Sequence, residues 1–150
     1  VGRLVTEKSP GIFLRSFAEV IKQSQLYFNN SKNINKKHDH PLLLEAVMIG
    51  DGPLLLGLQY LANELGILER VKFTGNLNTS QVVKEMRRAD VLVNPRVDGE
   101  TFGFIFVEAA LNMLPVIAFN KGSASEIIAN GRLVNQTTVA ALTEAMWCEY

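Results

Sequence analysis

Short apolar runs alternate along this sequence with longer segments in which apolar residues recur every three to four positions. The short runs have the length of buried strands, and the periodic segments are typical of amphipathic helices. We predict strands at residues 1–5, 42–49, 71–74, 91–93, 115–119 and 133–134, and helices at 10–28, 54–65, 79–86, 102–113, 125–129 and from 137 onward. Strands with such continuous apolar sequences are covered by helices on both faces of the sheet. The alternation of strands and helices therefore predicts an α/β fold, a Rossmann-like doubly wound parallel sheet.

Polar residues mark the boundaries of these elements. Ser9 is placed to cap the first helix, and Asn78 or Thr79 is placed to cap the third. The stretch 29–41 is rich in Asn and Lys and has no apolar period, so we predict that it forms a loop.

The loops that follow the predicted strands hold the candidate chemistry. In an open parallel sheet, ligands bind beyond the carboxyl ends of the strands, where helix N-termini offer unpaired N–H groups. Arg3 and Lys8 bracket the first such loop and together could neutralise a diphosphate. Glu100 precedes a predicted helix, and Glu108 lies inside that helix in an apolar segment, where a ribose is a suitable partner for a carboxylate.

Each of these charges also has a simpler interpretation. Arg3 and Lys8 can be ordinary surface cations with Glu7 as a counter-charge, and Glu108 can face solvent on an amphipathic helix. The combination favours a site, because two cations and two carboxylates fall at one predicted sheet edge.

The composition narrows the classes of function. The 150 residues, 47% hydrophobic, fit one domain, and 15 Lys and Arg balance 15 Asp and Glu, so neither nucleic acid nor an anionic membrane surface is favoured. The longest apolar runs, about eight residues, are far short of the ~20 needed to span a bilayer. The lone Cys148 fits a reducing compartment, and we expect a cytoplasmic protein, with the cytoplasmic face of a membrane as the alternative for the full-length chain. Because the sequence begins Val1-Gly2-Arg3 without an initiator Met, we interpret it as an excised piece.

Two further motifs favour no site. His38 and His40 flank Asp39 in the polar loop, but a structural metal site needs more ligands, so we predict no metal. Gly50 and Gly52 follow a predicted strand but lack the third glycine of a dinucleotide-binding motif, and they indicate a tight turn at the ligand edge.

Taken in order, the motifs resemble a known family. They resemble, nearly end to end, the C-terminal, donor-binding half of GT-B fold glycosyltransferases of family 4. The matching stretches are residues 1–4 with Glu7-Lys8, 49–53, 71–75, 89–91, Glu100 to Gly103 through Glu108-Ala109, 114–118 and 122–128. Lys8 is followed by Ser9, where the family usually has Gly.

The resemblance implies a role for each candidate residue. It implies that Arg3 and Lys8 hold the diphosphate of a nucleotide sugar, that Glu100 binds the hydroxyls of the transferred sugar, and that Glu108 binds the ribose. The remaining implied donor-binding residues are Phe102, Gly103 and Phe104 around the helix N-terminus, Gly52 in the turn, and Asn76 and Leu77 beside the base. A UDP- or GDP-sugar would be the substrate, with no metal and no other cofactor.

The function implied is a retaining glycosyltransferase of the hexosyltransferase type with a hydroxyl acceptor. We expect residues 1–150 to be its donor-binding domain, truncated at both ends, lacking the N-terminal acceptor domain and therefore inactive alone. The alternatives are a non-catalytic nucleotide-sugar binding module and a sugar-nucleotide epimerase of the same fold.

Overall fold

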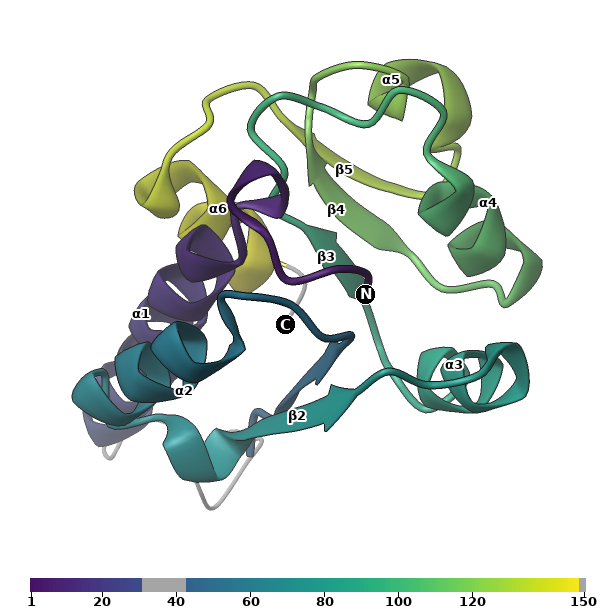
Figure 1. Ribbon diagram of the computed structural model, residues 1–150. Coiled ribbons are helices and arrows are strands. Elements are labelled where there is room, and N and C mark those ends of the chain that lie inside the picture. Colours follow the sequence, from purple (N-terminus) through teal and green to yellow (C-terminus); the bar gives the residue numbers. More distant parts are fainter. Residues whose placement is uncertain (31–42, 149–150) are drawn as a thin grey trace.

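The computed structural model describes residues 1–30 and 43–148 and shows helices on both sides of parallel strands (Figure 1). Its elements are η1 (Thr6–Lys8), α1 (Pro10–Asn30), β1 (Ala46–Ile49), α2 (Leu55–Glu64), η3 (Leu68–Arg70), β2 (Val71–Gly75), α3 (Thr79–Met86), β3 (Leu92–Asn94), α4 (Phe104–Leu111), β4 (Val116–Phe119), α5 (Ala124–Ile127), β5 (Gly131–Val134) and α6 (Val139–Trp147). Most of the predicted elements are present within a few residues. The larger shifts are β1, which begins four residues later than predicted, and α4, which is shorter at both ends. Of the predicted loop 29–41, residues 31–41 lie outside the described part of the chain.

The strands are parallel and carry a core on each face. β1 pairs with β2, and β3, β4 and β5 pair in that order. Along β4, Ile117 and Phe119 belong to one buried cluster, while Val116 and Ala118 belong to the other. The first cluster lies under α1, α2 and α6, and the second lies under α3, α4 and α5 (Figure 1). This arrangement confirms the doubly wound α/β prediction.

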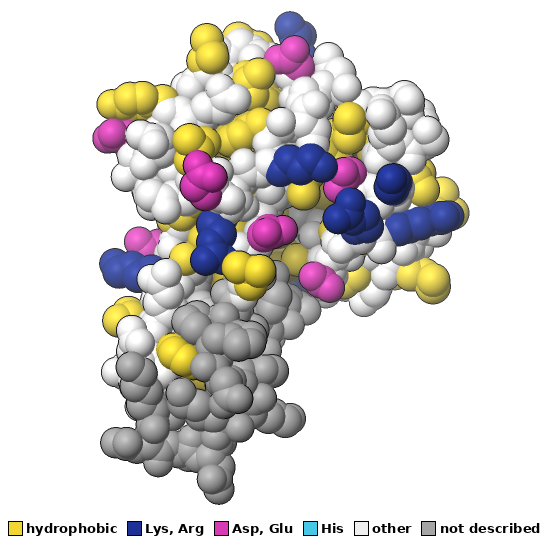
Figure 2. Space-filling model, turned by 90° about the horizontal axis from the view of Figure 1, so that it is seen from below, with side chains coloured by type: hydrophobic (Ala, Val, Ile, Leu, Met, Phe, Trp, Pro, Cys, Tyr) yellow, Lys and Arg dark blue, Asp and Glu magenta, His cyan; other side chains and the backbone are white. Residues whose placement is uncertain are grey.

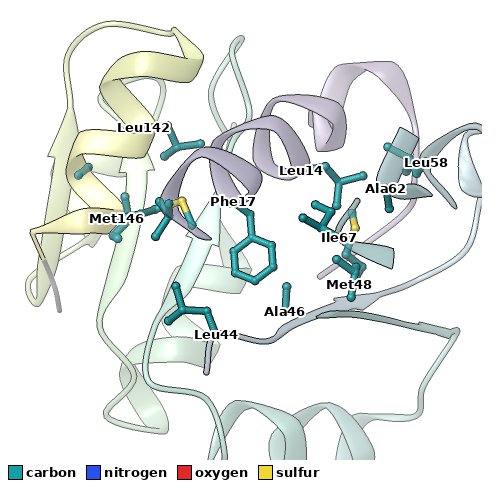
Figure 3. Packing of buried hydrophobic residues seen from close by; sticks show 14 of the residues in the cluster. Leu14, Phe17, Leu44, Ala46, Met48, Leu58, Ala62, Ile67, Leu142 and Met146 are labelled. Carbon is teal, nitrogen blue, oxygen red and sulfur yellow. The ribbon is translucent and has the colours of Figure 1, made fainter. Parts of the chain in front are cut away.

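The larger core is built mainly on α1. Leu14, Phe17 and Val20 are spaced three residues apart and are buried, so one face of the helix lies against the strands. Figure 3 shows Leu14 and Phe17 pointing from α1 toward side chains of β1 and α2. The neighbouring α6 also packs on α1, where the Ser16 hydroxyl donates to the carbonyl of Val139 at 3.1 Å. These contacts fix the start of α1, and hence the loop before it.

The predicted strand at Val1–Val5 is wrong. The segment is extended, with Gly2 N–H donating to Ile49 O at 2.8 Å and Leu4 N–H donating to Asp51 O at 2.9 Å. The chain turns into η1 immediately afterwards, so these bonds to the end of β1 are too few for a ladder. As a result, β1–β2 and β3–β4–β5 are two separate sheets among the described residues. A cavity of about 470 Å³ is lined by both β1 and β3, and by Gly2, Lys8 and Glu100.

Helix caps follow the prediction at Asn78 and differ at Ser9. Asn78 accepts from Gln81 N–H at 3.0 Å, and the Gln81 side chain returns a bond to Asn78 N–H, forming a capping box. Ser9 instead has φ 48° and ψ 41°, a left-handed conformation, and its hydroxyl lies 3.5 Å from the carbonyl of Thr6. A glycine would adopt this conformation without strain, which explains in physical terms why a glycine suits the position after Lys8.

The surface near α3 is basic. Figure 2, viewed from below, shows Lys and Arg side chains grouped on the side where α3 lies in Figure 1. Lys72 pairs with Glu85 at 2.9 Å, and the charges of Lys84 and Arg88 also act on this carboxylate. The Lys72 hydrogen bond lowers the pKa of Glu85, against a smaller opposing effect of burial.

Candidate functional site

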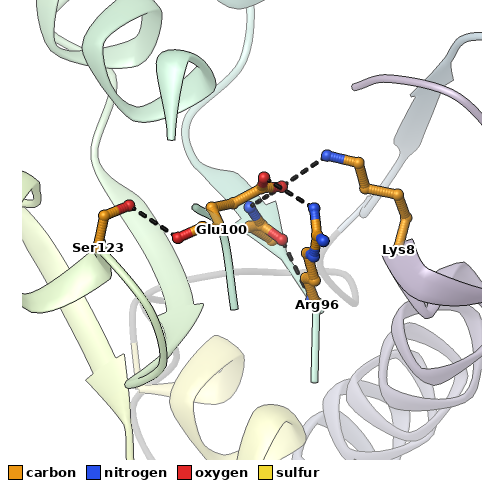
Figure 4. Close-up of polar contacts among 5 residues, drawn as sticks. Lys8, Arg96, Glu100 and Ser123 are labelled. Carbon is orange, nitrogen blue, oxygen red and sulfur yellow. Dashed lines mark hydrogen bonds and ion pairs between the residues drawn. The ribbon is translucent and has the colours of Figure 1, made fainter. Parts of the chain in front are cut away.

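The predicted cation Lys8 and carboxylate Glu100 meet at the carboxyl end of the strands (Figure 4). The Lys8 ammonium lies 2.6 Å from Glu100 Oε1, although 92 positions separate the two residues. Lys8 comes from η1 and Glu100 from the loop between β3 and α4. The side chain of Glu100 is only 11% exposed, whereas that of Lys8 is 32% exposed. The pair is therefore a partly buried ion pair. The Lys8 ammonium can move away from the carboxylate toward solvent.

Glu100 has two further partners, one at the end of β3 and one in its own loop. The Arg96 guanidinium donates from Nη1 to Glu100 Oε2 at 3.0 Å, and the Asn94 amide lies 3.4 Å from Oε1. Sequence reasoning missed both residues. Arg96 precedes Glu100 by four residues and carries the opposite charge, which was the signal available in the sequence. A spacing of four brings two side chains together only in a helix, and this segment is a loop.

The main chain of Glu100 is held as firmly as its side chain. Its carbonyl accepts from Ser123 N–H at 2.9 Å and from the Ser123 hydroxyl at 3.0 Å. Gly122 has φ 58°, and a Cβ at that position would collide with the Glu100 carbonyl oxygen. The β3–α4 loop and the β4–α5 turn thus pack backbone against backbone, which only glycine permits here.

The charge state of Glu100 follows from these contacts. Burial favours the neutral carboxyl and would raise its pKa. The hydrogen bond and charge of Lys8, the charge of Arg96 and the hydrogen bond from Asn94 outweigh burial, and the pKa of Glu100 is lowered. Glu100 is therefore an anion at neutral pH, ready to accept hydrogen bonds.

The N-terminus of α4 opens beside this cluster. Gly103 is its N-cap with φ 66°, and no side chain caps the helix. The flanking rings of Phe102 and Phe104 are stacked with centroids 4.8 Å apart and are 66% and 68% exposed. An uncapped helix N-terminus carries free N–H groups and a positive dipole end, the features that bind anions.

A second cavity holds the remaining predicted residues. Gly52, Asn76 and Leu77 line a space of about 530 Å³ together with Arg3. A Cβ at Gly52 would collide with the carbonyl of Leu4, so this turn packs directly on the N-terminal segment. Arg3 lines both cavities and is exposed, and among the described residues no carboxylate lies within ion-pair distance of it.

Glu108 lies on α4 and is exposed. The expectation that burial forces a partner on it is wrong, because α4 buries only Phe106 and Ala109 and leaves Phe104 and Val107 exposed as well. The charge of Glu108 nevertheless acts on the Val1 amino group, as do the charges of Lys8 and Glu100. Glu108 therefore lies within electrostatic range of the Val1 amino group.

The described residues contain neither a cluster of metal ligands nor a helix that could span a membrane. Within residues 1–30 and 43–148, no three His, Cys, Asp or Glu side chains are grouped as a metal site would require. His38 and His40 lie outside the described residues. No helix in the described part of the chain is long and apolar enough to cross a bilayer.

Comparison with known proteins gives consistent matches. The family model for glycosyl transferases group 1 matches residues 1–147. The GDP-mannose-dependent alpha-(1-6)-phosphatidylinositol monomannoside mannosyltransferase of Mycobacterium tuberculosis is 33% identical over 109 residues, which are 67% of this chain and 28% of that protein. The D-inositol 3-phosphate glycosyltransferase of Nocardia farcinica is 31% identical over 137 residues, which are 87% of this chain and 27% of that protein. The chain spans less than a third of the length of these two relatives.

Solved structures share the fold. The Anabaena protein HepE, in complex with UDP and glucose, has a TM-score of 0.75 at 22% identity, covering 98% of this chain and 37% of that one. The C-terminal domain of a glycosyl transferase group 1 family protein from Francisella tularensis has a TM-score of 0.72 at 22% identity, covering 97% and 70%. These likenesses confirm the Rossmann-like fold.

Proposed function

Because this chain belongs to the glycosyl transferases group 1 family, we propose that it is the donor-binding half of a retaining glycosyltransferase of family 4. The enzyme would transfer a hexose from a UDP- or GDP-sugar to a hydroxyl acceptor. The observation that carries the proposal is the meeting of Lys8 and Glu100 beside the uncapped N-terminus of α4. A cation, a carboxylate and free N–H groups together suit a ligand that joins a diphosphate to a sugar.

In the proposed reaction these residues would stabilise the leaving group, which is the nucleoside diphosphate. When the bond between the sugar and the diphosphate breaks, negative charge develops on the diphosphate oxygens. Lys8, Arg3 and the N–H groups around Gly103 would stabilise that charge, and Glu100 would hold the sugar hydroxyls. The helix N-terminus and Glu100 are held in place before the reaction, so their contribution costs little reorganisation, whereas Lys8 has to turn from Glu100 to the diphosphate.

The nucleoside has its own set of groups. Glu108 is exposed, and among the described residues its carboxylate makes no hydrogen bond or ion pair, so both oxygens can accept from the two ribose hydroxyls. Asn76 and Leu77 line the cavity next to Arg3, where we place the base. The proposal needs no metal, because fixed cations and a helix dipole do that work.

The names of similar proteins support this donor class. One relative is described as GDP-mannose-dependent, and one protein of the same fold is described in complex with UDP and glucose. They do not agree on the base, so both nucleotides belong in the test. The full-length enzyme would add an N-terminal acceptor-binding domain and work in the cytoplasm, either free or at the cytoplasmic face of a membrane.

Calorimetric titration of the chain with UDP, GDP and ADP tests the proposal. We expect one of the three to bind at micromolar to millimolar concentration, and Glu108→Ala to weaken that binding about tenfold by removing a charge-assisted contact to ribose. Glu144→Ala is the matched control, since Glu144 is also an exposed helical glutamate but lies on α6. Absence of binding at millimolar nucleotide, or equal effects of the two variants, would show that the assignment is wrong.

Turnover separates the alternatives. We expect residues 1–150 to bind the donor and to leave it chemically unchanged. Isomerisation of a UDP- or GDP-sugar in the absence of an acceptor would favour the epimerase, and donor binding by a full-length protein that transfers nothing would favour a binding module.

A further inference from the structure

The two cations on Glu100 differ in how they are attached. Lys8 reaches the carboxylate from a loop 92 positions away and is about one-third exposed. Arg96 belongs to the same loop as Glu100, and its own N–H donates to Asn94 Oδ1 at 3.1 Å. Because the Asn94 amide also lies 3.4 Å from Glu100 Oε1, the residues Asn94, Arg96 and Glu100 are linked to one another by three hydrogen bonds.

A diphosphate would compete with Glu100 for Lys8. The lysine ammonium is a point charge on a flexible stem with three rotatable donors, so it can turn from a single carboxylate to a more highly charged phosphate. Glu100 would then lose its shortest contact at the moment when it must bind the sugar. A carboxylate that is 11% exposed and left without a counter-charge is strongly disfavoured and tends to take up a proton.

Arg96 remains in place through that exchange. Its guanidinium is always charged, and its side chain is 23% exposed. Its Nε is buried and has no hydrogen-bond partner among the described residues, so the guanidinium holds an unused donor beside the carboxylate. A buried donor without a partner is uncommon in proteins. The Nε–H of Arg96 is therefore available for a further hydrogen bond when the partners of Glu100 change.

We propose that Arg96 is the positioning residue of this site, which keeps Glu100 ionised and aimed at the transferred sugar once Lys8 has moved to the diphosphate. This inference rests on the proposed function. The two cations then have different roles: Lys8 moves from the carboxylate to the ligand, whereas Arg96 stays with the carboxylate. Glu100 touches the sugar, and Arg96 acts through Glu100.

Binding measurements provide the first test. The variants Arg96→Met and Arg96→Lys are titrated with UDP, UDP-glucose, GDP and GDP-mannose. We expect Arg96→Met to bind the preferred nucleotide within about twofold of the parent chain, while its affinity for the corresponding nucleotide sugar relative to the nucleotide falls about tenfold. Arg96→Lys, which keeps the charge, recovers most of that ratio. An equal loss for nucleotide and nucleotide sugar, or no loss for either, would overturn the positioning role.

A second test needs no nucleotide. The pKa of Glu100 is followed by carboxyl ¹³C NMR in the parent chain and in Arg96→Met, with and without inorganic pyrophosphate. Among the described residues, the charged side chains that contact Glu100 are Lys8 and Arg96. In the parent chain we expect pyrophosphate to raise this pKa slightly, because Arg96 remains, and in Arg96→Met we expect a large rise.

The two tests distinguish the two proposals. If the parent chain binds neither UDP nor GDP, the proposed function fails, and the pyrophosphate titration still measures whether Arg96 holds Glu100. If pyrophosphate raises the pKa of Glu100 equally in both proteins, Arg96 does not hold the carboxylate, and this inference fails while the proposed function stands.

Discussion

Two lysine–glutamate ion pairs in this protein have similarly short N–O distances but differ in their surroundings. Lys72 and Glu85 lie 2.9 Å apart near α3, and Lys8 and Glu100 lie 2.6 Å apart at the strand ends. Lys72 is 59% exposed, and the charges of Lys84 and Arg88 also act on its partner Glu85. The two carboxylates are similarly buried, with side chains 16% exposed in Glu85 and 11% exposed in Glu100, but Glu100 also touches a second cation and an amide and has its main chain held from another loop. The difference shows that a short ion pair does not mark a site, whereas convergence of several segments on one buried carboxylate does.

Removing the backbone support of Glu100 is expected to have the largest effect. In Gly122→Ala, the new Cβ would meet the Glu100 carbonyl and the residue would be held at φ 58°. We expect a loss of about 3 kcal/mol in the free energy of unfolding, measured by urea denaturation. Gly57→Ala is the control, because a Cβ there meets nothing within 4 Å, and it should stabilise α2 by about 0.5–1 kcal/mol. Similar values for the two variants would contradict the close packing of the two loops.

Replacing one lysine of each pair tests the comparison directly. Lys8→Met removes the cation proposed for the diphosphate, and we expect the affinity for UDP or GDP, whichever binds, to fall 10- to 100-fold, about 1.4–2.7 kcal/mol. Lys72→Met removes the 2.9 Å pair and should change the affinity less than twofold and the unfolding free energy by about 0.5 kcal/mol or less. Calorimetry and urea denaturation measure the two quantities. Equal losses of affinity would mean that overall charge, and not the site, governs binding.

The pH dependence of stability gives the smallest contrast. Both Glu100 and Glu85 have lowered pKa values, so each contributes stability that is present above the unfolded-state pKa of about 4.3 and is lost as the pH falls through the folded-state pKa. We expect Glu100→Gln to remove about 1 kcal/mol of this dependence between pH 6 and pH 3, and Glu85→Gln to remove a few tenths. In 0.5 M NaCl the Glu85 contribution should be screened and the Glu100 contribution should persist. If the Glu100 contribution disappears in salt, the charges of the site are screened by solvent as strongly as those on the surface.

Much of the fold could be predicted because it follows from local pattern. The alternation of strand-length runs and helical periods identifies the layers, and the Asn78 cap needs only its own neighbours. The strand at Val1–Val5 could not be judged in this way, because a strand exists only if its backbone groups have partners on a neighbouring strand. This segment makes only two such bonds, from Gly2 to Ile49 at the end of β1 and from Leu4 to Asp51 just beyond it.

The site was predictable only in part for the same reason. Lys8 and Glu100 could be placed at one sheet edge in advance, because loops that follow parallel strands converge there, but their direct ion pair was not predicted. Arg96 and Gly122 could not, since their roles depend on a side chain crossing a loop and on a backbone approach between two loops. The exposure of Glu108 also depends on packing, because an apolar helix can be left half uncovered.

The firm seating of Glu100 has a consequence for the speed of ligand entry. Its carbonyl is tied to Ser123 and its carboxylate to Arg96, while the contact that a diphosphate would displace is made by the flexible end of Lys8. Side chains at partly exposed positions reorient in picoseconds to nanoseconds, whereas loops take nanoseconds to microseconds. Admission of a ligand here therefore requires one ammonium group to swing and no backbone to open, so the encounter would be limited by diffusion rather than by the protein.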